Sequence, residues 1–251
     1  MSYLFPLPVP SVSSLISICF RGKVTKYVVI QILLYVVCRP TFLKIVKAKS
    51  VMEFKPDPYV ATILNCAVWV FYGMPFVHPD SLLVVTINGF GLGIELIYVS
   101  IFFIFSDWSK RRKIIIALII EVIFMAILIV VTLTFLHGTK NRSMLIGIIA
   151  IVFNVIMYTS PLTVMKKVIT TKSVKYMPFY LSLANFANGL VWTSYALFKF
   201  DPYILIPNGL GSLSGLVQLI LFAVFYRTTN WNDDDEKEVE LSAHKSSKTD
   251  V

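Results

Sequence analysis

A short pattern of polar residues occurs twice in this chain, each time beside a long apolar run. The first copy spans Trp69–Gly91 and the second spans Trp192–Gly211. In both copies a Trp and a Tyr stand three residues apart, an Asp follows, and an apolar run ends in Asn-Gly-x-Gly. An asparagine inside a membrane is costly unless it has a partner, so two at matching places indicate a shared role. The pattern is typical of a transporter whose substrate site lies between two halves of a duplicated bundle.

Seven apolar segments are long enough to cross a membrane as helices. Hydrophobic residues make up 57% of the 251 residues, which is too many for a soluble domain of this size. The segments run roughly 17–25 residues, the length that a helix needs to cross ~30 Å of hydrocarbon. They are Val24–Ile45, Pro58–Val77, Ser81–Phe105, Ile114–Leu136, Met144–Met165, Pro178–Phe198 and Tyr203–Tyr226. We therefore predict an all-α membrane protein with seven transmembrane helices.

The last three spans repeat the first three, whereas the fourth span has no counterpart. Because one helix separates the two triplets, both enter the membrane in the same direction and form parallel repeats about an axis along the membrane normal. The fold is then a 3+1+3 arrangement of two three-helix repeats and a linker helix. The predicted parts are an N-terminal segment (residues 1–23), the first repeat (24–112), the linker helix with its outer loop (113–143), the second repeat (144–229) and a disordered cytoplasmic tail (230–251).

Lysine and arginine residues gather in the loops on one side of the predicted membrane. Twelve follow spans one, three and five (Lys44, Lys47, Lys49, Lys55, Lys110, Arg111, Arg112, Lys113, Lys166, Lys167, Lys172, Lys175), and three lie on the other side (Lys140, Arg142, Lys199). Cytoplasmic loops carry the excess of positive charge, so we expect the N-terminus outside the cell and the C-terminus in the cytoplasm. We expect the protein in the plasma membrane. Arg21, Lys23 and Lys26 disagree with this orientation. The net charge of +9 lies mostly in such short loops, which favours membrane lipid over nucleic acid as a partner.

The chain shows no cluster of side chains suited to metal binding or acid–base chemistry. The cysteines (Cys19, Cys38, Cys66) lack the spacing of metal ligands, and the histidines lie at span ends (His78, His137) or in the tail (His244). We therefore expect no enzyme activity, no metal and no cofactor. Two carboxylates, Glu95 and Glu121, lie within spans. Glu95 has Gly215 as its counterpart in the second repeat, and Glu121 lies in the linker helix. We therefore expect structural hydrogen bonds from both.

Several short blocks between Pro40 and Trp231 resemble the SWEET family of sugar facilitators, which is related to the PQ-loop transporters. They are the Lys-Ser-Val stretches that begin at Lys49 and Lys172, and Tyr59–Cys66, Tyr72-Gly73, Pro75–Val77, Met157–Leu162, Met177–Phe179 and Pro202–Gly209. The blocks are most similar to those of plant members thought to prefer hexoses. The resemblance implies a bidirectional, gradient-driven uniporter for a small neutral sugar, a hexose such as glucose or galactose, working by alternating access. Homo- or hetero-oligomers with related transporters are expected. A proton-coupled small-solute transporter of the PQ-loop type and a seven-helix receptor are the alternatives.

The resemblance also implies which residues line the sugar pocket. In the family, an Asn from each third helix and a side chain from each second helix do so, which here are Asn88 and Asn208 with Trp69 and Trp192. The chemistry fits a neutral sugar, because amides both donate and accept hydrogen bonds and aromatic rings stack on the C–H faces of the sugar. The alternative is that the Asn pair bonds helix to helix and that the Trp residues fill space or anchor the interface.

Two further groups of residues follow from the same resemblance. Pro58, Pro161 and Pro178 match three members of a proline tetrad that lets helices hinge, since proline removes a helical hydrogen bond and kinks the helix. At the fourth position of the tetrad, in the first helix, this chain has Cys38 instead of proline. The first helix and the N-terminal segment before it both depart from the family pattern. Tyr72 and Asp201 match a pair thought to close an extracellular gate. Static kinks and an ordinary surface hydrogen bond are the alternatives.

Overall fold

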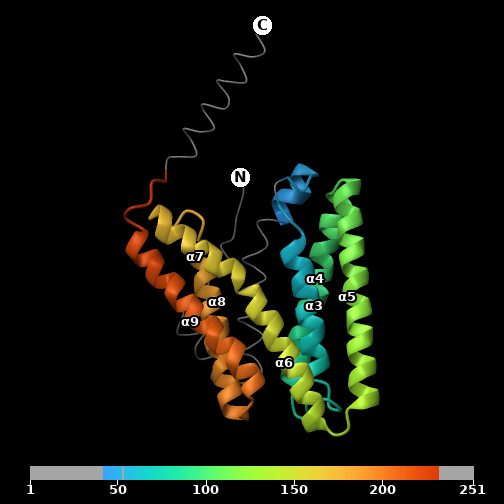
Figure 1. Ribbon diagram of the computed structural model, residues 1–251. Helices are drawn as coiled ribbons and strands as arrows, with labels where there is room; N and C mark the ends of the chain where they lie inside the picture. The colour runs from blue at the N-terminus through green and yellow to red at the C-terminus, as the bar shows by residue number, and fades with distance from the viewer. Residues whose placement is uncertain (1–41, 53, 232–251) are drawn as a thin grey trace, which may run out of the picture.

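Figure 1 shows the computed structural model, which describes residues 42–52 and 54–231. Within these ranges the regular structure is helical, and residues 42–48 are in helical conformation. Seven complete helices follow: α3 (Asp57–Tyr72), α4 (Leu82–Phe105), α5 (Trp108–Phe135), α6 (Thr139–Met157), α7 (Thr159–Thr171), α8 (Phe179–Lys199) and α9 (Pro202–Phe225). Most of the first predicted span, the N-terminal segment, Cys38 and nearly all of the predicted tail lie outside the described residues.

Within the described ranges, four helical stretches are long and apolar enough to cross a membrane: α4, α5, α9 and the stretch Thr139–Thr171 that α6 and α7 form together. An all-α protein with membrane-spanning helices is therefore confirmed, whereas the prediction of seven spans is confirmed only in part. The helix α3 has 16 residues, which extend about 24 Å at 1.5 Å per residue and fall short of the hydrocarbon thickness. The helix α8 is long enough, but Asn185 and Asn188 lower its hydropathy.

The helix α5 has the side chains expected of a helix that faces lipid. Its large apolar residues, such as Ile116, Val122 and Phe135, are exposed along its length. At its start, Asp107 caps the helix by accepting a hydrogen bond from the amide of Lys110 at 3.0 Å. Arg111 then donates to the last carbonyls of α4, those of Phe103 at 2.8 Å and Ile104 at 2.7 Å. This turn holds α4 and α5 together at their ends.

The helices form two packed groups that α6 joins. Helix α3 packs along α4, with α5 beside them, and α8 packs along α9. Helix α6 contacts both α3 and α9 (Figure 1). The α8–α9 contact is close because Gly189 lies against the backbone of Ser212, and Gly215 lies against the backbone of Phe186. Glycine at such a contact lets two helix backbones approach.

The predicted fifth span is not one continuous helix. It is broken at Tyr158, which ends α6 and precedes α7. Pro161 explains the break, because it has no N–H to donate to the carbonyl of Met157 four residues earlier. Regular bonding resumes at once, since the amide of Leu162 donates to the carbonyl of Tyr158 at 3.1 Å. The break therefore changes the direction of the chain without leaving the membrane-spanning stretch.

The close α8–α9 contact predicts a sharp difference between two glycine substitutions. A Cβ at Gly215 would lie 2.8 Å from the Cα of Phe186, whereas a Cβ at Gly93 would meet nothing within 4 Å. We expect Gly215→Ala to destabilise the protein by about 1–3 kcal/mol through overpacking. Gly93→Ala, the matched control, should be neutral or stabilise by up to ~1 kcal/mol. Thermal unfolding in detergent measures both, and equal melting temperatures for the two variants would contradict this packing.

Candidate functional site

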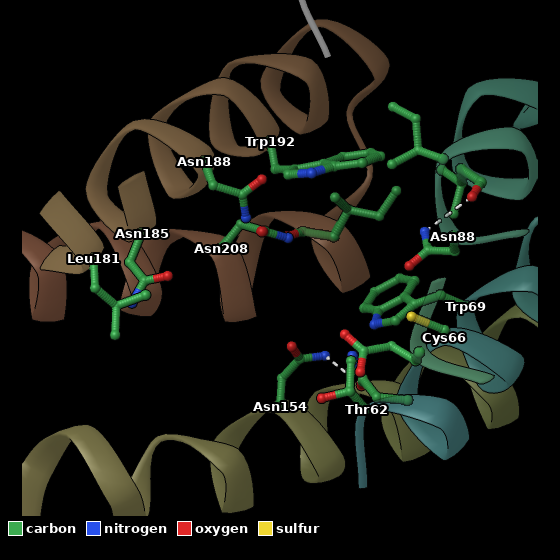
Figure 2. Close-up of a pocket in the computed structure, with 15 residues that line it drawn as sticks. Thr62, Cys66, Trp69, Asn88, Asn154, Leu181, Asn185, Asn188, Trp192 and Asn208 are labelled. Atoms are coloured by element: carbon green, nitrogen blue, oxygen red, sulfur yellow. Dashed lines mark hydrogen bonds between the residues drawn. The ribbon is translucent and has the colours of Figure 1, made fainter. Parts of the chain in front are cut away.

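A polar cavity of about 310 Å³ lies in the interior of the bundle, within the size range of small-ligand pockets (Figure 2). Trp69 from α3, Asn88 from α4, Trp192 from α8 and Asn208 from α9 all line it. The structure thus brings the four predicted site residues together around one space. Each copy of the repeated sequence pattern supplies one Trp and one Asn to the lining.

The two asparagines have the same local geometry. Asn88 Nδ2 donates to the carbonyl of Val84 at 2.9 Å, and Asn208 Nδ2 donates to the carbonyl of Ile204 at 2.8 Å. Each amide therefore uses one N–H on its own helix, four residues back, and keeps its Oδ1 and its second N–H for a ligand. Neither side chain bonds another helix among the described residues, so the geometry does not match the helix-to-helix alternative.

The two tryptophans also repeat each other. Trp69 is 6% exposed and Trp192 is 8% exposed. Each packs edge to face against the Tyr of its own motif, Trp69 on Tyr72 at 5.4 Å between ring centroids and Trp192 on Tyr195 at 5.6 Å. Such aromatic pairs hold ring orientation. Figure 2 shows both indoles at one end of the cavity, close to Asn88 and Asn208.

Four more asparagines line the cavity and were missed by sequence reasoning. They are Asn65, Asn154, Asn185 and Asn188. Asn154 Nδ2 donates to Asn65 Oδ1 at 3.3 Å, which links α6 to α3. Helical periodicity was the available signal, since Asn65 precedes Trp69 by four residues and Asn188 precedes Trp192 by four, which places each pair on one helix face.

The expectation for the two intramembrane carboxylates is wrong in part. Glu95 lines the cavity, is 7% exposed, and has a buried Oε2 without a hydrogen-bond partner in the described chain. Glu121 on α5 also has a buried, unpartnered Oε2, but it does not line the cavity. The expected structural hydrogen bonds to these oxygens are absent from the residues that the structure describes. Among the described residues that line the cavity, Glu95 is the one with a formal charge.

The three predicted hinge prolines lie at helix ends or near a helix break. Pro58 is in the first turn of α3 and Pro178 is the N-cap of α8. A proline in the first turn removes no helical hydrogen bond, so the expected kink mechanism applies to Pro161 alone. Motion at Pro58 or Pro178 would have to occur between a helix and its preceding loop. The role of all three as hinges stays a prediction.

Pro207, inside α9, is a second place where a helical hydrogen bond is missing. Its carbonyl accepts a hydrogen bond from the Tyr158 hydroxyl at 2.7 Å. Tyr158 is the residue at which α6 and α7 are broken, so this bond connects the two irregular points of the second group of helices. A Cβ at Gly211 would collide with this hydroxyl, which explains why a glycine follows Pro207 by one turn.

The predicted gate pair, Tyr72 and Asp201, is in direct contact at one end of the bundle. The Tyr72 hydroxyl lies 2.9 and 3.0 Å from the two carboxylate oxygens of Asp201. His78 and Ser143 complete what we call the Asp201 cluster. Asp201 also caps α9 by accepting from the amides of Tyr203 and Ile204. The contact joins α3 to the start of α9, and its two residues come from the two copies of the pattern.

The sequence is similar to those of known sugar transporters. The family model described as "Sugar efflux transporter for intercellular exchange" matches the chain twice, at residues 25–110 and 144–230. The bidirectional sugar transporter SWEET5 of Arabidopsis thaliana is 72% identical over 197 residues, which are 78% of this chain and 82% of that protein. The bidirectional sugar transporter SWEET4 of the same plant is 57% identical over 206 residues, 82% of each chain.

A solved structure of a eukaryotic SWEET transporter has the same fold. It superposes with a TM-score of 0.75 at 36% sequence identity and covers 79% of this chain and 93% of that one. Members of this family are transporters and not enzymes, which agrees with the expectation from the sequence. With the family model matching well over half of the residues, and with relatives this similar, the chain belongs to the SWEET family of sugar transporters.

Proposed function

We propose that this protein is a bidirectional uniporter that moves a hexose down its concentration gradient. The observation that carries the proposal is the cavity, in which two Trp and two Asn side chains from matching places face one space. Relatives whose names describe bidirectional sugar transport support it. A hexose such as glucose or galactose suits a cavity of about 310 Å³ that two indoles narrow.

The polar lining is suited to a neutral, hydroxyl-rich ligand. Six asparagine side chains line the cavity, and amides can both donate to and accept from sugar hydroxyls. Asn88 and Asn208 already use one N–H on their own helices, which fixes their orientation before a ligand arrives. Such preorganisation lowers the entropy cost of binding.

We further propose that transport works by alternating access between two three-helix repeats joined by α5. The double match of one family model supports the repeat, and the α3–α4 pair corresponds to the α8–α9 pair by its motifs. The Asp201 cluster is then the extracellular gate, with the N-terminus outside, the C-terminus cytoplasmic and the protein in the plasma membrane. The break at Tyr158 and the missing helical hydrogen bond at Pro207 supply places at which the second repeat can bend.

Oligomers with itself or with related transporters, surrounded by lipid, are part of the same proposal. The apolar side chains exposed along α5 are the feature that supports it, because a membrane helix exposes such residues to lipid or to another subunit.

Proton-coupled transport is the second candidate, because Glu95 lines the cavity. An intramembrane carboxylate often belongs to a proton relay. We favour uniport because the second repeat has Gly215 at the corresponding place and no other formally charged residue among the described residues lines the cavity.

Uniport predicts that Glu95→Gln remains active and that a proton gradient does not drive accumulation. Glutamine keeps the size and hydrogen-bonding groups of a neutral carboxyl but cannot carry a proton across. Radiolabelled glucose entry into proteoliposomes, with and without an imposed pH gradient, measures both effects, and Glu121→Gln is the matched control outside the cavity. Accumulation of glucose above its external concentration under the gradient, lost in Glu95→Gln, would show proton coupling instead.

The cavity predicts that Asn88→Ala and Asn208→Ala each weaken hexose binding. Loss of one buried hydrogen-bonding group costs ~1–3 kcal/mol, which is roughly 5- to 150-fold in affinity. Asn141→Ala is the matched control, because Asn141 also donates to a carbonyl four residues back, that of His137, but lies outside the cavity. Calorimetry on the purified variants gives the affinities. Wild-type affinity in either cavity variant would remove that asparagine from the site.

The paired indoles predict a change in selectivity. Replacing Trp69 and Trp192 together by valine should weaken monosaccharide transport, because ring stacking is lost, and should admit sucrose, because the cavity is wider. Trp108→Val, at an exposed position at the start of α5, is the control. Competitive uptake of labelled glucose and sucrose in cells without other sugar carriers measures the ratio. An unchanged ratio with an unchanged rate would mean that the indoles do not contact the sugar.

A further inference from the structure

Glu95 brings a carboxyl group to the cavity from within α4. The residue lines the cavity and is 7% exposed. Its Oε2 is buried and has no hydrogen-bond partner among the residues that the structure describes. A buried polar atom without a partner costs free energy and is uncommon in folded proteins, so its presence calls for a reason. Because no bond within the described chain holds this oxygen, the carboxyl group can turn toward a ligand without breaking one.

Glu95 and Asn88 lie on one face of α4. They are seven residues apart, close to two full helical turns, so their side chains leave the helix in nearly the same direction. The Cα–Cβ bond of a helical residue is tilted toward the N-terminus of the helix, and Asn88 lies on that side of Glu95. Both residues line the cavity, so one ligand in this space can meet the amide and the carboxyl group.

The carboxyl group differs in its chemistry from the amides around the cavity. An amide both donates and accepts, whereas an ionised carboxylate only accepts and a protonated carboxyl group still has an oxygen that accepts. A hexose hydroxyl has one hydrogen to donate. A hydrogen bond to an ionised oxygen is roughly twice as strong as one between neutral groups. Glu95 therefore offers the acceptor that suits the hydrogen of one sugar hydroxyl.

We propose that Glu95 is a specificity-determining residue of the cavity, whose carboxyl group accepts a hydrogen bond from one hydroxyl of the bound hexose. This rests on the proposed function and adds a contact to those of the paired Trp and Asn residues. The bond needs an acceptor oxygen and no proton transfer, so it is compatible with uniport. The carboxyl group lowers the stability of the bundle, because its Oε2 is buried without a partner, and raises the affinity for the sugar. Stability and affinity are thus opposed at this position.

Glu95→Met tests both halves of this proposal. Methionine is unbranched and flexible, like glutamate, and has no strong hydrogen-bonding group. In detergent without sugar the variant should melt at or above the temperature of wild type, since a buried unpartnered oxygen is removed. Its affinity for glucose should fall roughly 5- to 150-fold, the loss expected for one buried hydrogen-bonding group. The rise in melting temperature with glucose concentration measures that affinity.

Two further variants are controls. Glu121→Met removes the other carboxyl group with a buried, unpartnered Oε2, one that does not line the cavity. It should also melt at or above the temperature of wild type, but it should bind glucose with wild-type affinity. Glu95→Gln keeps an oxygen acceptor in the cavity and should bind glucose more tightly than Glu95→Met does.

Deoxyglucoses, each lacking one hydroxyl of glucose, show which hydroxyl Glu95 contacts. One of them should bind wild type roughly 5-fold or more weakly than glucose does. The same deoxy sugar and glucose should bind Glu95→Met equally, because the two changes remove the same hydrogen bond and their effects do not add.

Three results would overturn the proposal. The first is wild-type affinity for glucose in Glu95→Met. The second is a melting temperature of Glu95→Met several degrees below wild type while that of Glu121→Met is not lowered, which would give Glu95 a structural role. The third is that every deoxy sugar binds wild type and Glu95→Met with the same ratio to glucose. Failure of the proposed function has a different signature, because wild type itself then shows no glucose-dependent rise in melting temperature and no transport.

Discussion

A cavity that six asparagine side chains line inside an apolar bundle must satisfy those amides even when it is empty. The protein does so with local bonds: Asn88 and Asn208 each donate to a carbonyl of their own helix, and Asn154 donates to Ala150 and Asn65. The cost of burying amides in a membrane is thereby reduced without closing the cavity. The remaining oxygens are left for a ligand with many hydroxyl donors, so the same bonds that permit folding define what the cavity can hold.

The helical backbone is irregular at two points that contact each other, one between α6 and α7 and one within α9. Pro161 breaks the helix at Tyr158, and Pro207 removes a bond within α9. The Tyr158 hydroxyl donates to the Pro207 carbonyl, so one side-chain bond connects the two irregular points. At the far end, the Asp201 cluster joins α3, α6 and α9 through side chains rather than through packing alone. The bundle thus has side-chain bonds at one end and irregular helix backbone further along.

Much of the site could be read from the sequence because the chain carries it twice. Trp69 and Trp192, like Asn88 and Asn208, stand at matching places, and the resemblance to the SWEET family implied that they line one pocket. The four additional asparagines were missed because they lie before the Trp at which each copy of the pattern begins, or in α6, although Asn65 and Asn188 each precede the Trp of their repeat by four residues. Glu95 was misread because the residue at its place in the second repeat, Gly215, has no carboxylate. Its counterpart Gly215 is a glycine because the backbone of Phe186 lies against it, which carries no information about the cavity.

The limits of the repeat also show at the Asp201 cluster. Asp80 and Asp201 each follow the Trp and Tyr of their own motif, but Asp201 lies seven residues before Asn208, whereas Asp80 lies eight before Asn88. Asp201 accordingly caps α9 and bonds Tyr72, while Ser81 is the N-cap of α4 and Asp80 has a left-handed backbone with φ of 57° in an exposed loop. The break of α6 from α7 was likewise beyond a reading of hydropathy, because both halves are apolar enough to belong to one span.

Protection of Cys66 from alkylation tests most directly whether hexose occupies this cavity. Cys66 lines it next to Trp69 and Asn65, and in a Cys19→Ser, Cys38→Ser background it is the one thiol of the chain. Labelling of the purified protein with N-ethylmaleimide, with and without saturating glucose, gives the rate of modification. Binding between the two Trp–Asn pairs predicts that glucose slows the reaction and that Asn208→Ala weakens this protection. The same rate with and without glucose, in a protein that transports glucose, would place the sugar elsewhere.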